Sequence, residues 1–148
     1  MPALGSGTPP SPTSQANPPL LHRMLGIGMV ILAAVIVILR QTVMSGPIDE
    51  GLLFPAYVVM GASALMIATS LMMLKPRVPR RRAGQTRDAY WADVNTARQA
   101  MLVWFLLEGS AVLASVAFFL SASPIAAALI VAGVVAFWMN GPGVFETE

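Results

Sequence analysis

The amino-acid sequence predicts an all-α integral membrane protein with four transmembrane helices, arranged as two antiparallel hairpins. Hydrophobic residues make up 56% of the 148 positions and charged residues only 11%, whereas a soluble domain carries about 25% charged residues. Four apolar runs follow one another along the chain, and residues that end helices separate them. A lipid bilayer is therefore the expected environment of this chain.

The first 19 residues are expected to form a disordered cytoplasmic tail. They include six prolines and no charged side chain, and such a segment buries too little apolar surface to offset the entropy lost on ordering. Residues 20–143 are predicted to form one transmembrane domain, followed by a short tail at residues 144–148.

The four spans are predicted at about residues 22–40, 52–74, 99–120 and 124–140. A helix needs about 17–25 residues to cross a hydrocarbon core of roughly 30 Å. The first and fourth apolar runs reach this length only with arginine or tryptophan side chains at their ends. Residues 45–47 separate the first two spans, Pro124 suits the first turn of the fourth helix, and residues 141–143 end it.

The first span has an alternative interpretation as a cleaved signal peptide, with the cut near residues 43–45. Its apolar stretch is longer than the roughly 7–15 residues of such peptides. A retained span is therefore the favoured interpretation.

The distribution of charge predicts the orientation. Seven of the nine lysines and arginines lie in the loop at residues 75–98, and these residue types are retained on the cytoplasmic side. We expect this loop and both termini to be cytoplasmic, in the inner membrane of a bacterium. Trp91, Trp104 and Trp138 fall toward the same side, as the aromatic residues of a membrane interface do.

The end of this loop carries a helix signal. Thr86 is expected to cap a helix in which four residues recur at helical spacing, namely Tyr90, Val94, Ala97 and Met101. That helix is either an interfacial element or the cytoplasmic extension of the third span.

Glu108 is the only ionisable residue between positions 99 and 120. A carboxylate at the centre of a bilayer costs about 2.5–3.5 kcal/mol, and no lysine or arginine reaches that depth from a loop. We therefore expect Glu108 to be protonated at neutral pH and to donate a hydrogen bond. Trp104, Ala111 and Ser115 share its helix face, so this face is expected to point into the bundle.

Two serines are candidates to accompany Glu108. Ser115 lies on the same helix face, and Ser63, near the middle of the second span, would lie at about the depth of Glu108 in an antiparallel pair. With them, Glu108 is a candidate proton- or cation-binding carboxyl. Alternatively, it is a neutral acid that joins helices, worth under about 2 kcal/mol, and the two interpretations have about equal support.

Small residues predict a packing surface on the fourth span. Ala128, Ala132 and Ala136 recur every four residues, and such a stripe allows another helix to approach closely.

The basic stretch is a candidate site for anionic lipid headgroups. It contains Lys75, Arg77, Arg80, Arg81 and Arg82. The simpler interpretation is that these residues only set the orientation. Nucleic acid is not an expected partner, because no predicted folded domain presents the charge.

Residue types limit the possible chemistry. The chain has no cysteine and one histidine, His22, which excludes cysteine-based metal sites and leaves little room for histidine catalysis. The sequence shows no nucleotide-binding loop and no nucleophile paired with a base. We expect no cofactor, no metal and no enzymatic activity.

The third span carries a short resemblance to known proteins. Residues 98–109 read Arg-Gln-Ala-Met-Leu-Val-Trp-Phe-Leu-Leu-Glu-Gly. With the turn and span that follow, this resembles a group of small, uncharacterised four-span bacterial proteins with an Arg, an apolar stretch and Leu-Glu-Gly on the third helix. It looks, more distantly, like the double hairpin of the rotor-ring subunits of proton-translocating ATPases. Those subunits carry their acid on the second helix of a hairpin, whereas Glu108 is on the first.

The first resemblance implies four spans and brings no activity, while the second implies ion binding at Glu108. The leading hypothesis is a non-enzymatic membrane protein, an accessory or assembly subunit of a larger complex or a homo-oligomer, with Glu108 as a packing or interaction residue. The alternative is an oligomeric proton- or cation-binding component. A membrane enzyme ranks third.

The orientation can be tested with reporter fusions. A topology reporter fused after Lys75 is expected to report a cytoplasmic position, because it lies at the start of the basic loop. A reporter fused after Asp49 is expected to report the opposite side of the membrane. A cytoplasmic signal from the Asp49 fusion would refute the predicted orientation.

Overall fold

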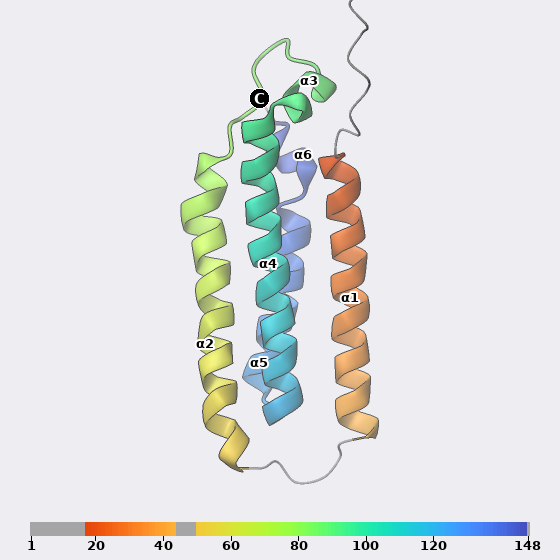
Figure 1. Cartoon of the computed structure of the whole chain (residues 1–148), viewed down its shortest axis with the longest axis vertical. Coiled ribbons are helices and arrows are strands. Elements are labelled where there is room, and N and C mark those ends of the chain that lie inside the picture. The colour runs from red at the N-terminus through yellow and green to blue at the C-terminus, as the bar shows by residue number, and fades with distance from the viewer. Residues whose placement is uncertain (1–16, 44–49, 148) are drawn as a thin grey trace, which may run out of the picture.

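The computed structural model describes residues 17–43 and 50–147, and every regular element within them is helical. Four long helices run side by side, and two short helices, α3 and α6, lie at one end (Figure 1). The long helices are α1 (Pro18–Thr42), α2 (Leu53–Thr69), α4 (Val94–Ser121) and α5 (Pro124–Met139). The predicted all-α class is confirmed for the described part of the chain.

Short irregular turns extend α2 at both ends. A 3-10 turn, Glu50–Leu52, precedes it, and a π-helical turn, Ser70–Leu74, and a second 3-10 turn, Lys75–Arg77, follow it. The segment therefore remains helical from Glu50 to Arg77.

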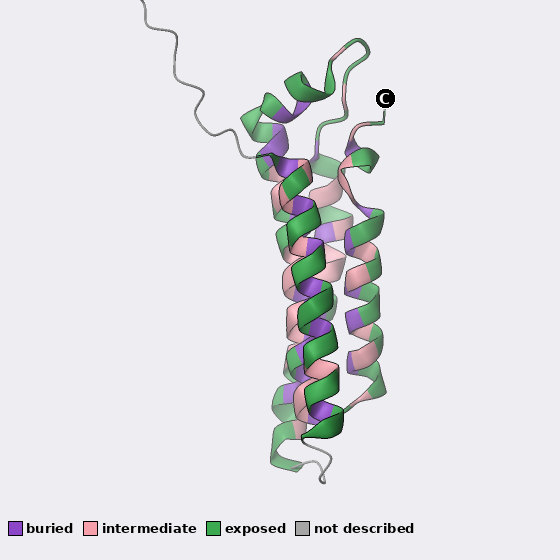
Figure 2. Cartoon of the chain, turned by 90° about the vertical axis from the view of Figure 1, so that its right-hand side faces the viewer, coloured by how far each residue is buried: buried purple, intermediate pink, exposed green. Residues whose placement is uncertain are grey.

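Three segments are long and apolar enough to cross a membrane, namely Pro18–Thr42, Glu50–Arg77 and Val94–Ser121. The helix α5 is also apolar but has only 16 residues. Large apolar side chains such as Met24, Ile31 and Leu65 lie exposed on the outside of the bundle. Figure 2 shows the same for α1, which exposes most of its surface and buries a narrow stripe. This surface fits a lipid environment.

The ends of the helices differ in part from the predicted ones. Asn17 caps α1 by accepting a hydrogen bond from the backbone N–H of Leu20 at 3.3 Å, and Pro18 is the first helical residue. Residues 18 and 19 are therefore not part of a tail. The remaining predicted tail, residues 1–16, lies outside the described residues, as do the break at residues 45–47 and most of the possible cleavage site at residues 43–45.

The helix α5 begins at Pro124, the residue predicted to lie in the first turn of the fourth span, and a further short helix follows it. Asn140 ends α5, and Pro142 begins the short helix α6 (Pro142–Phe145). Phe145 of α6 is buried in the core, so this segment packs back onto the bundle.

The helix α4 lies at the centre of the bundle. It packs against α1, α2 and α5, and α1 and α2 lie on opposite sides of it (Figure 1). The predicted first hairpin is therefore opened, since α1 and α2 run antiparallel with α4 between them. The helices α4 and α5 form a close hairpin, whose turn contains Ala122 in the left-handed conformation, with a φ of 49°.

Small side chains allow the helices to approach α4. A Cβ atom added at Gly133 of α5 would lie 3.1 Å from both the Cβ of Ala111 and the Oγ of Ser110. Ala114 and Ala117 on α4 are also fully buried. Close approach of backbones is how helices gain packing energy in a lipid environment.

Polar side chains join α2 to α4. The Ser63 hydroxyl donates to the backbone carbonyl of Ser110 at 2.8 Å, and the Ser70 hydroxyl donates to that of Val103 at 3.0 Å. Both serines are fully buried. Each bond satisfies a hydroxyl that hydrocarbon could not satisfy, and contributes about 0.6 kcal/mol.

Aromatic side chains join α4 to the end of α5 and to α1. The Trp104 indole N–H donates to the backbone carbonyl of Asn140 at 2.7 Å. The ring of His22 lies 3.2 Å from the backbone carbonyl of Phe137, measured from Nε2, and stacks on the Phe137 ring at 4.3 Å. The lone histidine therefore holds α1 against α5.

Two predictions are partly wrong, namely which face of α5 packs and whether the three tryptophans are exposed at the membrane interface. Ala128 and Ala132 are exposed and Ala136 is half-buried, because α5 instead turns Ala126, Ile130, Gly133 and Phe137 inward. Trp104 and Trp91 are buried in the core, and only Trp138 is exposed as an interfacial residue would be.

The helix expected after Thr86 is interrupted. Thr86 caps α3 (Arg87–Ala92) as predicted, but Asp93 then caps α4 by accepting a bond from the backbone N–H of Thr96 at 2.9 Å. The expected continuous stripe is therefore wrong at Val94, which is exposed.

The close contact between α4 and α5 gives a stability prediction. Gly133→Leu is expected to lower the free energy of unfolding by about 1–3 kcal/mol, because the added atoms meet the α4 backbone. Gly28→Leu is the matched control, since nothing lies within 4 Å of a Cβ atom at Gly28. Thermal unfolding in detergent, followed by tryptophan fluorescence, measures both, and equal effects would contradict the close contact.

Candidate functional site around Glu108

Glu108 lies on α4, at the edge of its buried face. Trp104, Ala111 and Ser115 are buried, as expected for a face that points into the bundle, but Glu108 itself is only half-buried. Its carboxyl has no hydrogen bond or ion pair with any other residue that the structure describes. The expected hydrogen bond from Glu108 is therefore not formed within the described chain.

The outer side of Glu108 borders an apolar surface. Phe105, one turn before it, is exposed, and Val112, one turn after it, is half-buried. Gly109 lies on the side that α2 covers, where the Met66 methyl group would be 2.7 Å from an added Cβ atom. The carboxyl thus lies between the covered and the lipid-facing sides of α4.

The two candidate serines lie near this level but do not bind Glu108. Ser63 donates to the backbone carbonyl of Ser110, which places it at about the predicted depth. Ser115 donates to the backbone carbonyl of Ala111, four residues earlier in its own helix, at 2.8 Å. Both hydroxyl protons are therefore used by the backbone.

Metal ligands do not gather at this site. No group of three or more histidine, cysteine, aspartate or glutamate residues that could hold a metal ion occurs in residues 17–43 and 50–147.

The five basic candidates for headgroup binding do not form one site. Arg77, Arg80 and Arg82 are exposed, whereas Lys75 and Arg81 are half-buried. A cavity of about 840 Å³ beside the C-terminal segment brings only Lys75, Arg77 and Arg80 together.

A polar cluster that the sequence did not predict joins α3 to the C-terminal segment. The Arg87 Nε and the Trp91 indole N–H both donate to Oε1 of Glu146 at 2.8 Å. The Tyr90 hydroxyl donates to the backbone carbonyl of Pro79 at 2.7 Å. Glu146 falls in a segment expected to be a short tail, so no local pattern pointed to this contact.

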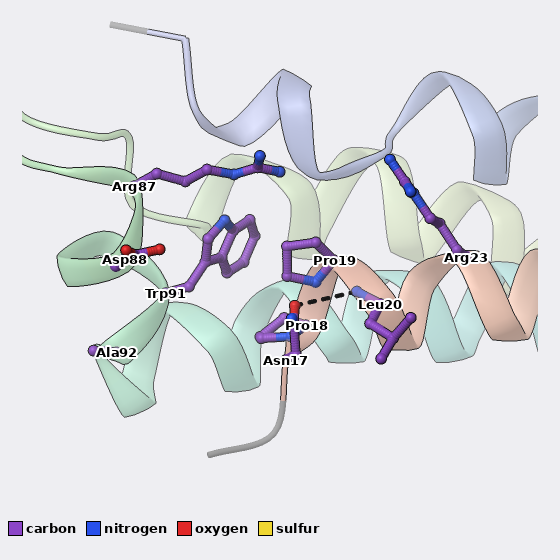
Figure 3. Close-up of a pocket in the computed structure, with 9 residues that line it drawn as sticks. All are labelled: Asn17, Pro18, Pro19, Leu20, Arg23, Arg87, Asp88, Trp91 and Ala92. Carbon is purple, nitrogen blue, oxygen red and sulfur yellow. Dashed lines mark hydrogen bonds between the residues drawn. The ribbon is translucent and has the colours of Figure 1, made fainter. Parts of the chain in front are cut away.

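A cavity of about 500 Å³ lies between the start of α1 and α3. Figure 3 shows the Arg87 side chain extending alongside Trp91 toward Pro19, with Arg23 on the other side of the two prolines. The ionisable groups of its lining are Arg23, Arg87 and Asp88. Arg87 is already bonded to Glu146, so the remaining charged groups of this lining are the Arg23 guanidinium and the Asp88 carboxylate.

Comparison with known protein families, with characterised proteins and with solved structures finds no match to this chain. The resemblances seen in the third span therefore stay predictions. The fold and the site define an all-helical protein with at least three helices able to span a membrane.

The buried Tyr90 gives a prediction for alkaline pH. Burial, together with the negative charges of Glu146 and Asp93, raises the pKa of Tyr90 from 10.0 to about 12. Between these values the unfolded state loses a proton that the folded state keeps, so the free energy of unfolding falls as the pH rises from about 10 to 12.

Phenolate absorbance measures this titration, and Tyr90→Phe supplies the control. The variant is expected to lack the absorbance step near pH 12 and the associated loss of stability. A wild-type titration without that step would contradict the burial of the Tyr90 hydroxyl.

Proposed function

We propose that the protein is a non-enzymatic, four-span subunit of a complex in a bacterial inner membrane. In this proposal both termini are cytoplasmic, and Glu108 joins the chain to a partner helix, from a second copy or from another membrane protein. The partner supplies the hydrogen bond that the described chain does not give to Glu108.

One observation carries the proposal, the half-buried and unpaired carboxyl of Glu108. A polar group without a partner in hydrocarbon costs several kcal/mol, so a membrane protein gains by covering it. A hydrogen bond between helices in lipid contributes about 0.6–2 kcal/mol. The unsatisfied group therefore favours association over an isolated chain.

The surface around Glu108 suits a partner helix. Phe105 and Val116 are exposed on the same side of α4, and Val112 lies between them. These apolar side chains would pack against a second helix while the carboxyl supplies a directional contact.

The arrangement of the ends supports four spans. The start of α1, the basic loop and the end of the described chain lie together at one end of the bundle (Figure 1). An even number of crossings gives this arrangement, and the basic residues favour the cytoplasm for that end.

Proton or cation binding at Glu108 stays the alternative hypothesis. A cation needs several oxygen ligands, and in the described residues neither Ser63 nor Ser115 contacts the Glu108 carboxyl, since both donate to backbone carbonyls instead. Association is therefore the function that this site supports best.

Two substitutions of Glu108 test the proposal. Glu108→Gln keeps a neutral hydrogen-bonding side chain and is expected to preserve association, whereas Glu108→Ala is expected to weaken it about tenfold, because the bond between helices is lost. Crosslinking in native membranes and blue native electrophoresis measure the complex. Glu50→Ala is the control, since it removes an exposed carboxyl away from this surface.

Wild-type association of Glu108→Ala would refute the proposal. If Glu108→Gln assembles normally but abolishes a pH-dependent ion flux in liposomes, the ion-binding hypothesis is the correct one.

A further inference from the structure

A groove of about 270 Å³ lies between the end of the α2 segment and the first turns of α4. Two arginines, two amides and two leucines line it, namely Leu74, Arg77, Asn95, Arg98, Gln99 and Leu102. It lies at the basic end of the bundle, away from Glu108, and does not depend on association there.

The groove carries two uncompensated positive charges. Arg77 and Arg98 are both exposed, and neither has a hydrogen bond or ion pair with a residue in the described part of the chain. No carboxylate lines the groove, in contrast to the cavity of Figure 3, where Arg87 is bonded to Glu146. An anion is therefore the ligand that this groove attracts.

The side chain of Gln99 adds an unsatisfied hydrogen-bond acceptor to the groove. Its Nε2 donates to Oδ1 of Asn95 at 3.2 Å, but its Oε1 is buried without a partner among the residues described. A buried acceptor without a donor is unfavourable. A ligand that combines an anion with a hydroxyl group would satisfy both the arginines and Gln99.

The leucines give the groove an apolar side. Leu102 is exposed on α4, and Leu74 ends the π-helical turn. A π turn holds one more residue than an α turn, so the residues after it are offset around the helix axis. Leu74 and Arg77 line one groove with Arg98.

We propose that this groove binds one anionic glycerophospholipid whose headgroup carries a free hydroxyl. The phosphate oxygens accept hydrogen bonds from Arg77 and Arg98, and the Gln99 side chain turns toward the groove so that its Oε1 accepts a hydrogen bond from the headgroup hydroxyl. The acyl chains lie along Leu74 and Leu102, toward the apolar surface of the bundle. Guanidinium groups suit phosphate because they offer paired donors in one plane.

Lipid binding to the full-length, delipidated protein in detergent tests this site by native mass spectrometry. Dioleoyl phosphatidylglycerol is expected to bind more tightly than dioleoyl phosphatidylcholine, whose headgroup is neutral overall and lacks a hydroxyl. Glycerol 1-phosphate, which has the headgroup chemistry without acyl chains, is expected not to compete. Effective competition by it would show a site for soluble phosphate and overturn the lipid assignment.

Matched arginine variants separate this groove from general attraction to the basic loop. Arg98→Gln is expected to lower phosphatidylglycerol affinity about tenfold, because a phosphate contact is lost. Arg82→Gln removes the same charge from the same end but outside the groove, and a change of less than about twofold is expected. Equal losses in the two variants would overturn the proposal.

Gln99→Leu tests the headgroup hydroxyl. It is expected to lower phosphatidylglycerol affinity while leaving the binding of dioleoyl phosphatidic acid, which has no alcohol on its phosphate, unchanged. Unchanged phosphatidylglycerol binding would refute the contact with Gln99. Unfolding measurements in detergent verify that each variant is folded.

Discussion

Hydrocarbon offers no hydrogen bonds, and the packing of this bundle depends on that constraint. The hydroxyls of Ser63 and Ser70 and the indole of Trp104 all donate to backbone carbonyls of other segments. These contacts surround α4, the helix on which the other three pack. In a lipid environment, apolar contact alone does not select one neighbour over another, so such bonds and close approach of small residues decide which faces meet.

The two ends of the bundle are built differently. At the basic end, α3 and α6 cover the core with aromatic rings, and Glu146 accepts bonds from both Arg87 and Trp91. At the other end, a tight turn through Ala122 joins α4 to α5. Charged side chains can be satisfied by one another and by water outside the hydrocarbon. Charged and polar side chains therefore lie together at the basic end, where the groove lined by Arg77 and Arg98 is also found.

The candidate site was only partly predictable. Glu108 is conspicuous in the sequence because no other ionisable residue lies within its span, and the depth of Ser63 followed from antiparallel helices. Whether the Glu108 carboxyl would be buried was not predictable. A rotation of α4 about its axis by a few tens of degrees is enough to move a residue from the buried face to its edge. Trp104 and Ala111 turn inward while Glu108 reaches the boundary. The groove lined by Arg77 and Arg98 was not predictable either, because its residues come from two segments that only the tertiary structure brings together.

The sequence by itself determined approximately where the four long helices run, because long apolar runs, prolines and caps such as Thr86 act locally. Only the tertiary structure decided which faces are buried. A helix that is apolar all round, as α5 is, carries no periodic signal for its inner side. Its alanine stripe therefore suggested the wrong face, and Gly133, which allows α4 to approach, lies on the right one.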